Sequence, residues 1–190
     1  MDSRSLVEAV GPVTVSIALI GARGSGKSTV GSEAARTLGR PFVDLDAMAL
    51  AITGADSVTA VFEQAGVHAW RQAEAAALEA VRASGAVIAT GGGVPAVDPP
   101  RHVLEAARGS GEIETLWLRC SIETLQRRLR ADPGDRPSLT GEDPVLEASA
   151  VAASRAEDYR RMADGVIDAD GDVGSVVQAV VAWIGRREDG

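Results

Sequence analysis

The amino-acid sequence predicts an α/β fold in three layers, with a central, mostly parallel five-stranded sheet between two layers of helices. Short apolar runs rich in β-branched residues alternate along the chain with stretches of helical length, as in parallel sheets covered on both sides. The first apolar run ends in a glycine-rich loop that leads directly into a helical stretch. The chain has 190 residues, of which 45% are hydrophobic, so it can bury one sizeable core, and its length favours a single domain.

Five runs are expected to form the strands. The first, at residues 13–20, has little polar interruption, which is typical of a strand buried on both faces of a parallel sheet. The other four are expected at residues 42–43, 86–89, 114–118 and 166–167.

Helices are expected between these strands, at residues 27–38, 67–83, 122–130, 146–162 and 173–186. Two segments interrupt the alternation. Residues 50–79 contain no convincing strand, so we expect inserted helices that form a small cap beside the sheet. Residues 131–143, ADPGDRPSLTGED, lack apolar periodicity and are expected to form an exposed, mobile loop. Residues 1–12 show no pattern of either kind and are expected to be disordered.

The composition argues against several classes of partner and location. The net charge of −8 and the pI near 4.8 disfavour a chain that binds nucleic acid or anionic membrane through general positive charge, so we expect neither as a partner. The single cysteine, Cys120, excludes an internal disulfide and fits a reducing compartment. No apolar run is long enough to span a bilayer, and no leader-like segment opens the chain. We therefore expect a cytoplasmic protein.

Residues 21–29, GARGSGKST, match the phosphate-binding pattern G-x-x-x-x-G-K-[ST] and stand between a buried strand and an amphipathic helix. Glycines allow the backbone N–H groups to point at a β-phosphate, and the start of the helix adds positive potential. Lys27 would reach the β- and γ-phosphates, and the Ser28 hydroxyl would bind Mg²⁺. The alternative is a glycine-rich turn without a ligand. The expected nucleotide contacts are Gly24, Ser25, Gly26, Lys27, Ser28 and Thr29.

The loop alone indicates a nucleotide and does not separate kinases from GTPases, ATPases or motors. The chain contains no asparagine, which excludes the N-K-x-D motif of base-reading G proteins, and it is small for a motor.

Two aspartates follow the second strand in the stretch FVDLD. If the strand persists, Asp44 and Asp46 point the same way, at the carboxyl end of the sheet where ligands of open α/β folds bind. Asp44 could hold Mg²⁺ through water, and Asp46 could orient or deprotonate an acceptor hydroxyl. The alternative role for this pair is to cap a helix.

Two further motifs flank the next strand. Arg71 and Glu74 are three residues apart on one helical face, where the plain alternative is a surface ion pair. Residues 87–93, VIATGGG, are a buried strand that opens into three glycines, which let a small ligand approach backbone amides closely. The alternative for the glycines is a flexible turn.

Taken in order, the motifs GxxGxGKST, FxDxD, TG, F with G-x-x-x-WRxxE, ATGGG, DRPxL and R-x-x-x-Y-x-x-x-AD resemble the shikimate kinase family, from about residue 15 to residue 168. The resemblance implies one kinase domain over residues 1–190, with a P-loop NTPase fold like that of nucleoside monophosphate kinases. Within it, residues 15–30 hold the first strand and P-loop, residues 46–84 a substrate-binding helical cap and residues 131–143 a mobile lid. It also implies a monomer that transfers the γ-phosphoryl of ATP, with Mg²⁺, to the 3-hydroxyl of shikimate in aromatic amino-acid biosynthesis.

The resemblance assigns roles to individual residues. Asp46 falls at the position of the base that contacts the shikimate hydroxyls. Arg71 and Arg155 fall at the positions of the arginines that bind the substrate carboxylate. Arg136 matches the lid arginine that reaches the phosphates. The other implied substrate contacts are Phe62, Trp70, Glu74, Gly91, Gly92 and Gly93.

The chain departs from the family pattern in places. Val67 and Leu50 stand where acidic residues are usual, and the lid reads RPSL in place of RPLL. The late arginine that helps to sandwich adenine has no counterpart, which leaves Arg128, between Arg127 and Arg130, as the expected nucleotide contact. Two alternatives remain open: a related kinase for another small hydroxy acid such as gluconate, and a non-catalytic nucleotide-binding homologue.

Overall fold

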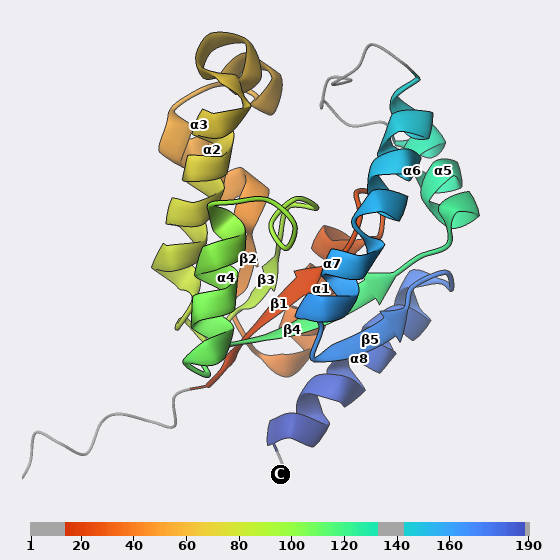
Figure 1. The fold of residues 1–190 in the computed structure, drawn as a ribbon. Coiled ribbons are helices and arrows are strands. Elements are labelled where there is room, and N and C mark those ends of the chain that lie inside the picture. The colour runs from red at the N-terminus through yellow and green to blue at the C-terminus, as the bar shows by residue number, and fades with distance from the viewer. Residues whose placement is uncertain (1–13, 133–142, 189–190) are drawn as a thin grey trace, which may run out of the picture.

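A five-stranded, entirely parallel sheet forms the middle layer of the molecule (Figure 1). The computed structural model describes residues 14–132 and 143–188. The strand order is β2-β3-β1-β4-β5, so the strand that leads into the glycine-rich loop lies at the centre of the sheet. The predicted fold class is thereby confirmed. The strands are β1 (Ser16–Ile20), β2 (Phe42–Asp44), β3 (Val87–Ala89), β4 (Ile113–Arg119) and β5 (Gly165–Asp168).

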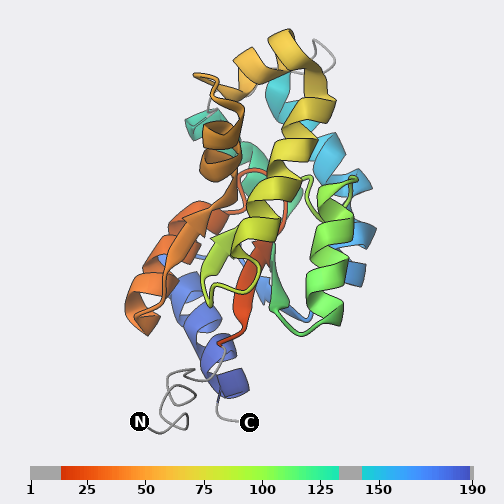
Figure 2. The same ribbon diagram turned by 90° about the vertical axis from the view of Figure 1, so that its left-hand side faces the viewer.

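Alternate side chains of β1 enter two separate hydrophobic cores, because successive residues of a strand point to opposite faces. Ile17 and Leu19 pack with α1 (Lys27–Leu38) and α8 (Val173–Glu188). On the other face, Ala18 and Ile20 belong to the larger core. Its helices are α2 (Leu45–Thr53), α3 (Val58–Val81), α4 (Pro100–Gly109), α5 (Ile122–Ala131), α6 (Pro144–Ser154) and α7 (Ala156–Met162). Figure 2 shows the sheet between these two layers.

The helices differ from the predicted ones in three ways. The cap consists of α2 and a longer α3, in which Gly66 breaks the helical geometry with a φ of 81°. Helix α4 was not predicted, although Pro100 suits the first turn of a helix and Leu104 lies on its buried face. The single helix expected at residues 146–162 is wrong, because the chain forms α6 and α7 with Arg155 between them. No proline or glycine marks this break, so local sequence does not reveal it.

Parts of the predicted lid and the predicted disordered amino-terminal segment lie outside the described residues. These are residues 133–142, which include Arg136, and residues 1–13. The domain boundaries therefore remain predictions.

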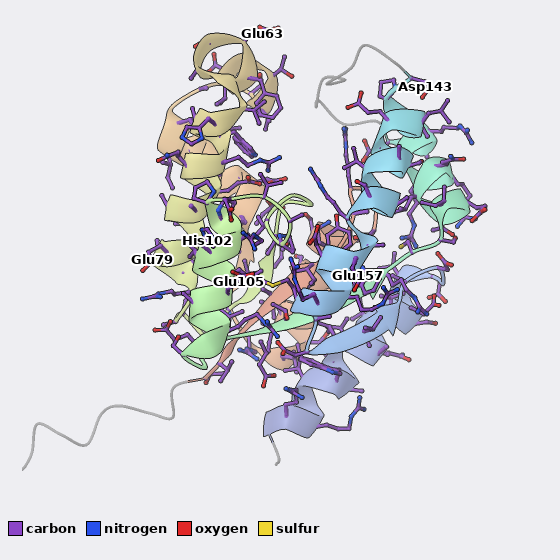
Figure 3. All side chains as sticks on the ribbon, viewed as in Figure 1. Glu63, Glu79, His102, Glu105, Asp143 and Glu157 are labelled. Atoms are coloured by element: carbon purple, nitrogen blue, oxygen red, sulfur yellow. The ribbon has the colours of Figure 1, made fainter. Side chains whose placement is uncertain are left out.

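Several helices carry exposed carboxylates. Glu63, Glu79 and Glu157 are exposed and project outward in Figure 3. Among the described helices, none alone has the length and apolar character to cross a membrane. By length and composition only, α2 and α3 pass that test as a pair bent by 78°.

Asp164, which directly precedes β5, is hydrogen-bonded to both α4 and β4. Its carboxylate accepts hydrogen bonds from the backbone N–H of Thr115 at 2.8 Å and from the Thr115 hydroxyl at 2.9 Å, both in β4. Arg108 of α4 donates to it from Nε at 3.2 Å and from Nη2 at 2.5 Å. Burial raises the pKa of the Asp164 carboxyl, but the bonds from Arg108 and Thr115 outweigh it and hold this pKa below its ordinary value.

We predict that Asp164→Asn lowers the free energy of unfolding at pH 7 by about 1–3 kcal/mol, since it weakens charged hydrogen bonds. Because the folded-state pKa is depressed, the wild-type advantage is complete above the unfolded-state pKa of about 4 and disappears as the pH falls through the folded-state pKa. Urea denaturation at neutral and acidic pH measures both values.

The exposed Asp56 provides the control, and Asp56→Asn is expected to change the free energy of unfolding by less than about 0.5 kcal/mol. An Asp164→Asn defect of equal size at neutral and acidic pH would contradict the role given to the ionised carboxylate.

Candidate active site

The loop between β1 and α1 has the form that the phosphate-binding motif requires. Gly26 immediately precedes the first residue of α1 and has a left-handed backbone, with φ 94° and ψ 13°. A residue with a Cβ would be strained there, so the motif glycine is a conformational requirement. The turn directs the chain into α1 from the centre of the sheet.

Lys27 curls back over this loop. Its ammonium donates hydrogen bonds to the carbonyl oxygens of Gly21 at 2.9 Å and Ala22 at 2.8 Å, and lies 3.4 Å from the Ser25 hydroxyl oxygen. The side chain thus places a positive charge inside the loop.

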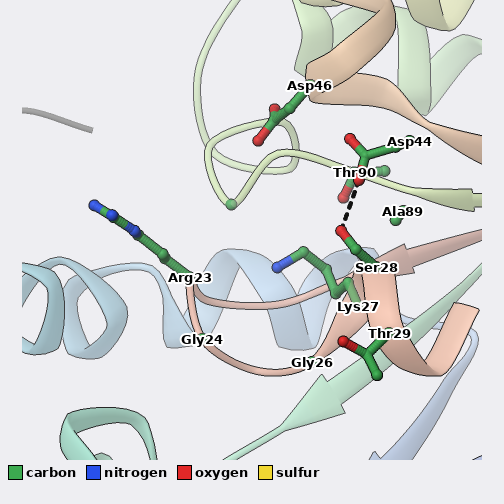
Figure 4. Close-up of a pocket in the computed structure, with 11 residues that line it drawn as sticks. Arg23, Gly24, Gly26, Lys27, Ser28, Thr29, Asp44, Asp46, Ala89 and Thr90 are labelled. Carbon is green, nitrogen blue, oxygen red and sulfur yellow. Dashed lines mark hydrogen bonds between the residues drawn. The ribbon is translucent and has the colours of Figure 1, made fainter. Parts of the chain in front are cut away.

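Ser28 and Asp44 bring two oxygen atoms together at the carboxyl end of β2. The Ser28 hydroxyl donates to Asp44 Oδ2 at 2.7 Å, as Figure 4 shows. Asp44 Oδ1 accepts from the backbone N–H of Ala47 at 3.1 Å and caps α2. The strand does not persist to Asp46, because α2 starts at Leu45, and the alternative that an aspartate of this pair caps a helix holds for Asp44.

These oxygens suit a hard cation. Hydroxyl and carboxylate oxygens are ligands that Mg²⁺ prefers, and it is usually held by one or two carboxylates together with phosphates and water. Within residues 14–132 and 143–188, no cluster of three or more Asp, Glu, His or Cys is placed to hold a metal. The Ser28–Asp44 pair therefore fits Mg²⁺ that arrives with a nucleotide.

A cavity of about 280 Å³ joins the loop to the second strand and the glycine triplet. In Figure 4, Asp46 faces this space from the side opposite Lys27. Three lining residues were not predicted. Of these, Arg23 occupies a variable position within the motif, and Thr90 directly follows β3 and donates its hydroxyl to the Leu19 carbonyl at 2.8 Å. The lining is Arg23, Gly24, Gly26, Lys27, Ser28, Thr29, Asp44, Asp46, Ala89, Thr90 and Gly92.

Arg71 and Glu74 form a buried ion pair on α3, so the alternative of a surface pair is wrong. Arg71 Nη1 lies 2.6 Å from Glu74 Oε2, and the two side chains are 10% and 0% exposed. Arg71 Nε is buried without a hydrogen-bond partner among the described residues. A buried donor in this state is suited to an anionic ligand.

Gly91 and Gly93 are required by close approach and not by backbone angle, since none of the three glycines has a positive φ. A Cβ on Gly91 would lie 2.3 Å from Glu74 Oε1 and 2.7 Å from Asp46 Oδ1. A Cβ on Gly93 would lie 2.5 Å from Arg71 Nη1. Gly91 and Gly93 therefore pack directly against three charged side chains, within a turn in which the Gly91 carbonyl accepts from the Val94 N–H at 3.1 Å.

Arg155 reaches the same triplet from the opposite side. Its Nη1 donates to the Gly92 carbonyl at 3.2 Å from the junction of α6 and α7. The guanidinium groups of Arg71 and Arg155, far apart in the sequence, thus both lie against the glycine triplet.

The two cap aromatics lie deeper than expected. Trp70 is 0% exposed and packs edge to face on the half-buried Phe62, with ring centroids 6.4 Å apart. Because Trp70 is fully buried in this conformation, its contact with a substrate ring stays a prediction that requires the side chain to become exposed.

A second cavity, of about 260 Å³, lies on the other side of the phosphate loop and includes Arg128 in its lining. Arg128 donates to the carbonyls of Ser25 at 3.3 Å and Ala169 at 2.8 Å, so it also supports the loop. Arg127 and Arg130 are exposed. The full lining is Gly24, Ser25, Gly26, Thr29, Val30, Arg128, Asp132, Ala169, Val173 and Val176.

Comparison with known proteins identifies relatives of the chain. The family described as "Shikimate kinase" matches residues 23–185. "Shikimate kinase 2" of Sodalis glossinidius is 37% identical over 171 residues, which cover 89% of this chain and 95% of that protein. Among solved structures, shikimate kinase from Acinetobacter baumannii in complex with shikimate has a TM-score of 0.80 at 29% identity, covering 92% of this chain and 96% of that one. A gluconokinase from Sinorhizobium meliloti has a TM-score of 0.57 at 19% identity, covering 92% and 93%, which shows a shared fold alone.

We predict that Gly91→Ala destabilises the protein by about 1–3 kcal/mol, because the added methyl must displace Glu74 from Arg71 or move the backbone. Thermal unfolding measures the loss.

Gly109→Ala is the matched control, since a Cβ at that helical position meets nothing within 4 Å. It is expected to be neutral or to stabilise by up to about 1 kcal/mol. Equal melting temperatures for the two variants would show that the triplet is not closely packed.

Proposed function

This chain belongs to the shikimate kinase family, and on this premise we propose that it transfers the γ-phosphoryl group of ATP to the 3-hydroxyl of shikimate. The products are shikimate 3-phosphate and ADP. One observation carries the proposal beyond family membership: a single cavity connects Lys27 and Ser28 of the phosphate loop with Asp46 and Gly92 on the acceptor side. Phosphoryl transfer depends mainly on placing donor and acceptor together in a site that stabilises charge.

On the donor side, Lys27 exchanges its loop carbonyls for β- and γ-phosphate oxygens. Ser28 and Asp44 would hold Mg²⁺, Asp44 through water, and the bound ion would neutralise phosphate charge. The proposed nucleotide contacts are those expected from the sequence: Gly24, Ser25, Gly26, Lys27, Ser28, Thr29, Arg128 and Arg136.

On the acceptor side, Arg71 and Arg155 bind the shikimate carboxylate, for which a planar guanidinium is the natural partner. Glu74 holds Arg71 in place through their 2.6 Å ion pair. Asp46 accepts the proton of the attacking hydroxyl. The amides of residues 91–93 bind the other hydroxyls, a task that their lack of side chains supports.

Two parts of the proposal rest on the sequence alone. Arg136 is proposed to close over the phosphates with the lid, and it lies outside the described residues. Contact of Phe62 and Trp70 with the substrate ring would require Trp70 to become exposed on binding, because it is fully buried here. A monomeric state is part of the proposal and rests on the resemblance to the family.

We predict that ADP release, followed in a coupled assay with ATP and Mg²⁺, requires shikimate and is negligible with gluconate or without an acceptor. Two arginines beside the triplet suit a compact acid with ring hydroxyls. Faster turnover of gluconate would favour a kinase for another hydroxy acid, and no turnover of any acceptor would favour a non-catalytic homologue.

We further predict that Arg71→Ala raises the KM for shikimate at least tenfold, about 1.4 kcal/mol, and changes the KM for ATP by less than about twofold. Steady-state kinetics with each substrate varied in turn provide the measurement.

Arg71→Lys separates charge from geometry, because it keeps the positive charge and loses the bidentate fork. Its KM for shikimate should lie between those of the wild type and Arg71→Ala. Equal losses for both substrates would contradict a carboxylate-binding role.

A further inference from the structure

The carbonyl of the middle glycine is held differently from its two neighbours. The Gly91 carbonyl accepts from the backbone N–H of Val94 at 3.1 Å, and the Gly93 carbonyl accepts from backbone N–H groups farther along the same loop. The Gly92 carbonyl instead accepts from two side chains near the start of α7, the Tyr159 hydroxyl at 2.8 Å and Arg155 Nη1 at 3.2 Å. Helix α7 therefore fixes the triplet at its centre.

Tyr159 is well placed to be a permanent donor. It is 2% exposed and its ring lies 5.8 Å from that of Trp117 in β4, tilted by 39°. Burial raises the pKa of its phenol, so the hydroxyl keeps its proton. Because Arg155 and Tyr159 are four residues apart across the first turn of α7, both side chains reach the same carbonyl.

The other side of Gly92 faces the phosphate loop. A Cβ on Gly92 would lie 3.4 Å from both the Arg23 amide nitrogen and the Gly21 carbonyl oxygen. A trans peptide directs its N–H opposite to its C=O, so the bond from Tyr159 turns the Gly93 N–H away from α7. The orientation of the triplet amides thus depends on what holds the Gly92 carbonyl.

The two side chains that donate to the Gly92 carbonyl differ in whether a bound substrate would also compete for them. The Tyr159 hydroxyl is buried beside Trp117 and donates its one proton to Gly92, whereas the half-buried Arg155, which also interacts with the Tyr159 hydroxyl, is the residue proposed to bind the substrate carboxylate. A carboxylate is a stronger acceptor than a neutral carbonyl, so a bound acid would draw Arg155 away from Gly92. A carbonyl left without a donor in a closed site would oppose that movement.

We propose that Tyr159 is a positioning residue: its hydroxyl keeps the Gly92 carbonyl hydrogen-bonded and so releases the Arg155 guanidinium to bind the carboxylate of the acceptor. This inference rests on the proposed function, because it concerns the same site. It assigns to Tyr159 a role in acceptor binding that acts through Arg155 and the triplet and not through direct contact.

The test uses Tyr159→Phe, which keeps the ring and removes only the hydroxyl. The KM for shikimate is expected to rise about tenfold, which corresponds to about 1.4 kcal/mol, while the KM for ATP changes less than about twofold. For shikimate methyl ester, which has no carboxylate charge, the same variant should show little change in kcat/KM. The ratio of kcat/KM for shikimate to kcat/KM for the ester is therefore expected to fall about tenfold in the variant.

Thr115→Val is the matched structural control. It also removes a buried hydroxyl, whose oxygen lies within hydrogen-bonding distance of the Met162 carbonyl at the end of α7 and of the Asp164 carboxylate. This variant should be less stable and yet keep the wild-type ratio between the two acceptors. If Tyr159→Phe lowers kcat/KM for both acceptors equally, its role is merely structural and the inference is overturned.

Arg155→Ala supplies a second test, because Tyr159 is proposed to act through Arg155. In the Arg155→Ala background, Tyr159→Phe should change the KM for shikimate by less than about twofold. Independent, multiplicative losses would overturn the inference. The activity of the wild type tests the proposed function separately. If the wild type does not phosphorylate shikimate, both proposals are wrong. If it does, and Tyr159→Phe leaves the ratio of kcat/KM for shikimate to kcat/KM for the ester unchanged, only the inference about Tyr159 is wrong.

Discussion

The site depends on the close approach of three side-chain-free residues to charged groups. Gly91 lies where any Cβ would be within 2.7 Å of carboxylate oxygens from both Asp46 and Glu74, and Gly93 is equally close to Arg71. Gly92 meets the phosphate loop on one side and α7 on the other. Because the backbone itself fills the centre, elements from both ends of the chain can converge on it without leaving a void.

Parallel topology brings these groups to one edge of the sheet. The phosphate loop, the two aspartates and the triplet lie at the carboxyl ends of β1, β2 and β3, and these three strands are neighbours in the order β2-β3-β1. The net charge of −8 belongs to the whole chain, in which exposed acids such as Glu63 on α3 are screened by solvent and Glu157 is paired with Arg160. The cations Lys27, Arg71 and Arg155 are held locally by loop carbonyls, Glu74 and Gly92, where the local field outweighs the distant net charge.

Sequence reasoning succeeded where chemistry and local structure coincide. The motif at residues 21–29 requires a strand, a turn and a helix, so it located β1 and α1 together. It failed where tertiary contact decides. The break at Arg155 has no local signal, and it coincides with the bond from Arg155 to Gly92, a residue on a different strand loop. The burial of the Arg71–Glu74 pair was equally invisible, because helical spacing shows which residues share a face but not what covers that face.

Asp44 shows why two interpretations of one residue need not compete. A carboxylate has two oxygens, and here Oδ1 caps α2 while Oδ2 accepts from Ser28. The cap fixes the side chain, and the fixed side chain presents its second oxygen to the phosphate loop. Lys27 follows similar logic, since the carbonyls that hold its ammonium in the loop are the groups that a phosphate must replace. Phosphate binding is then an exchange of partners within a preformed site, which lowers the reorganisation needed at the moment of transfer.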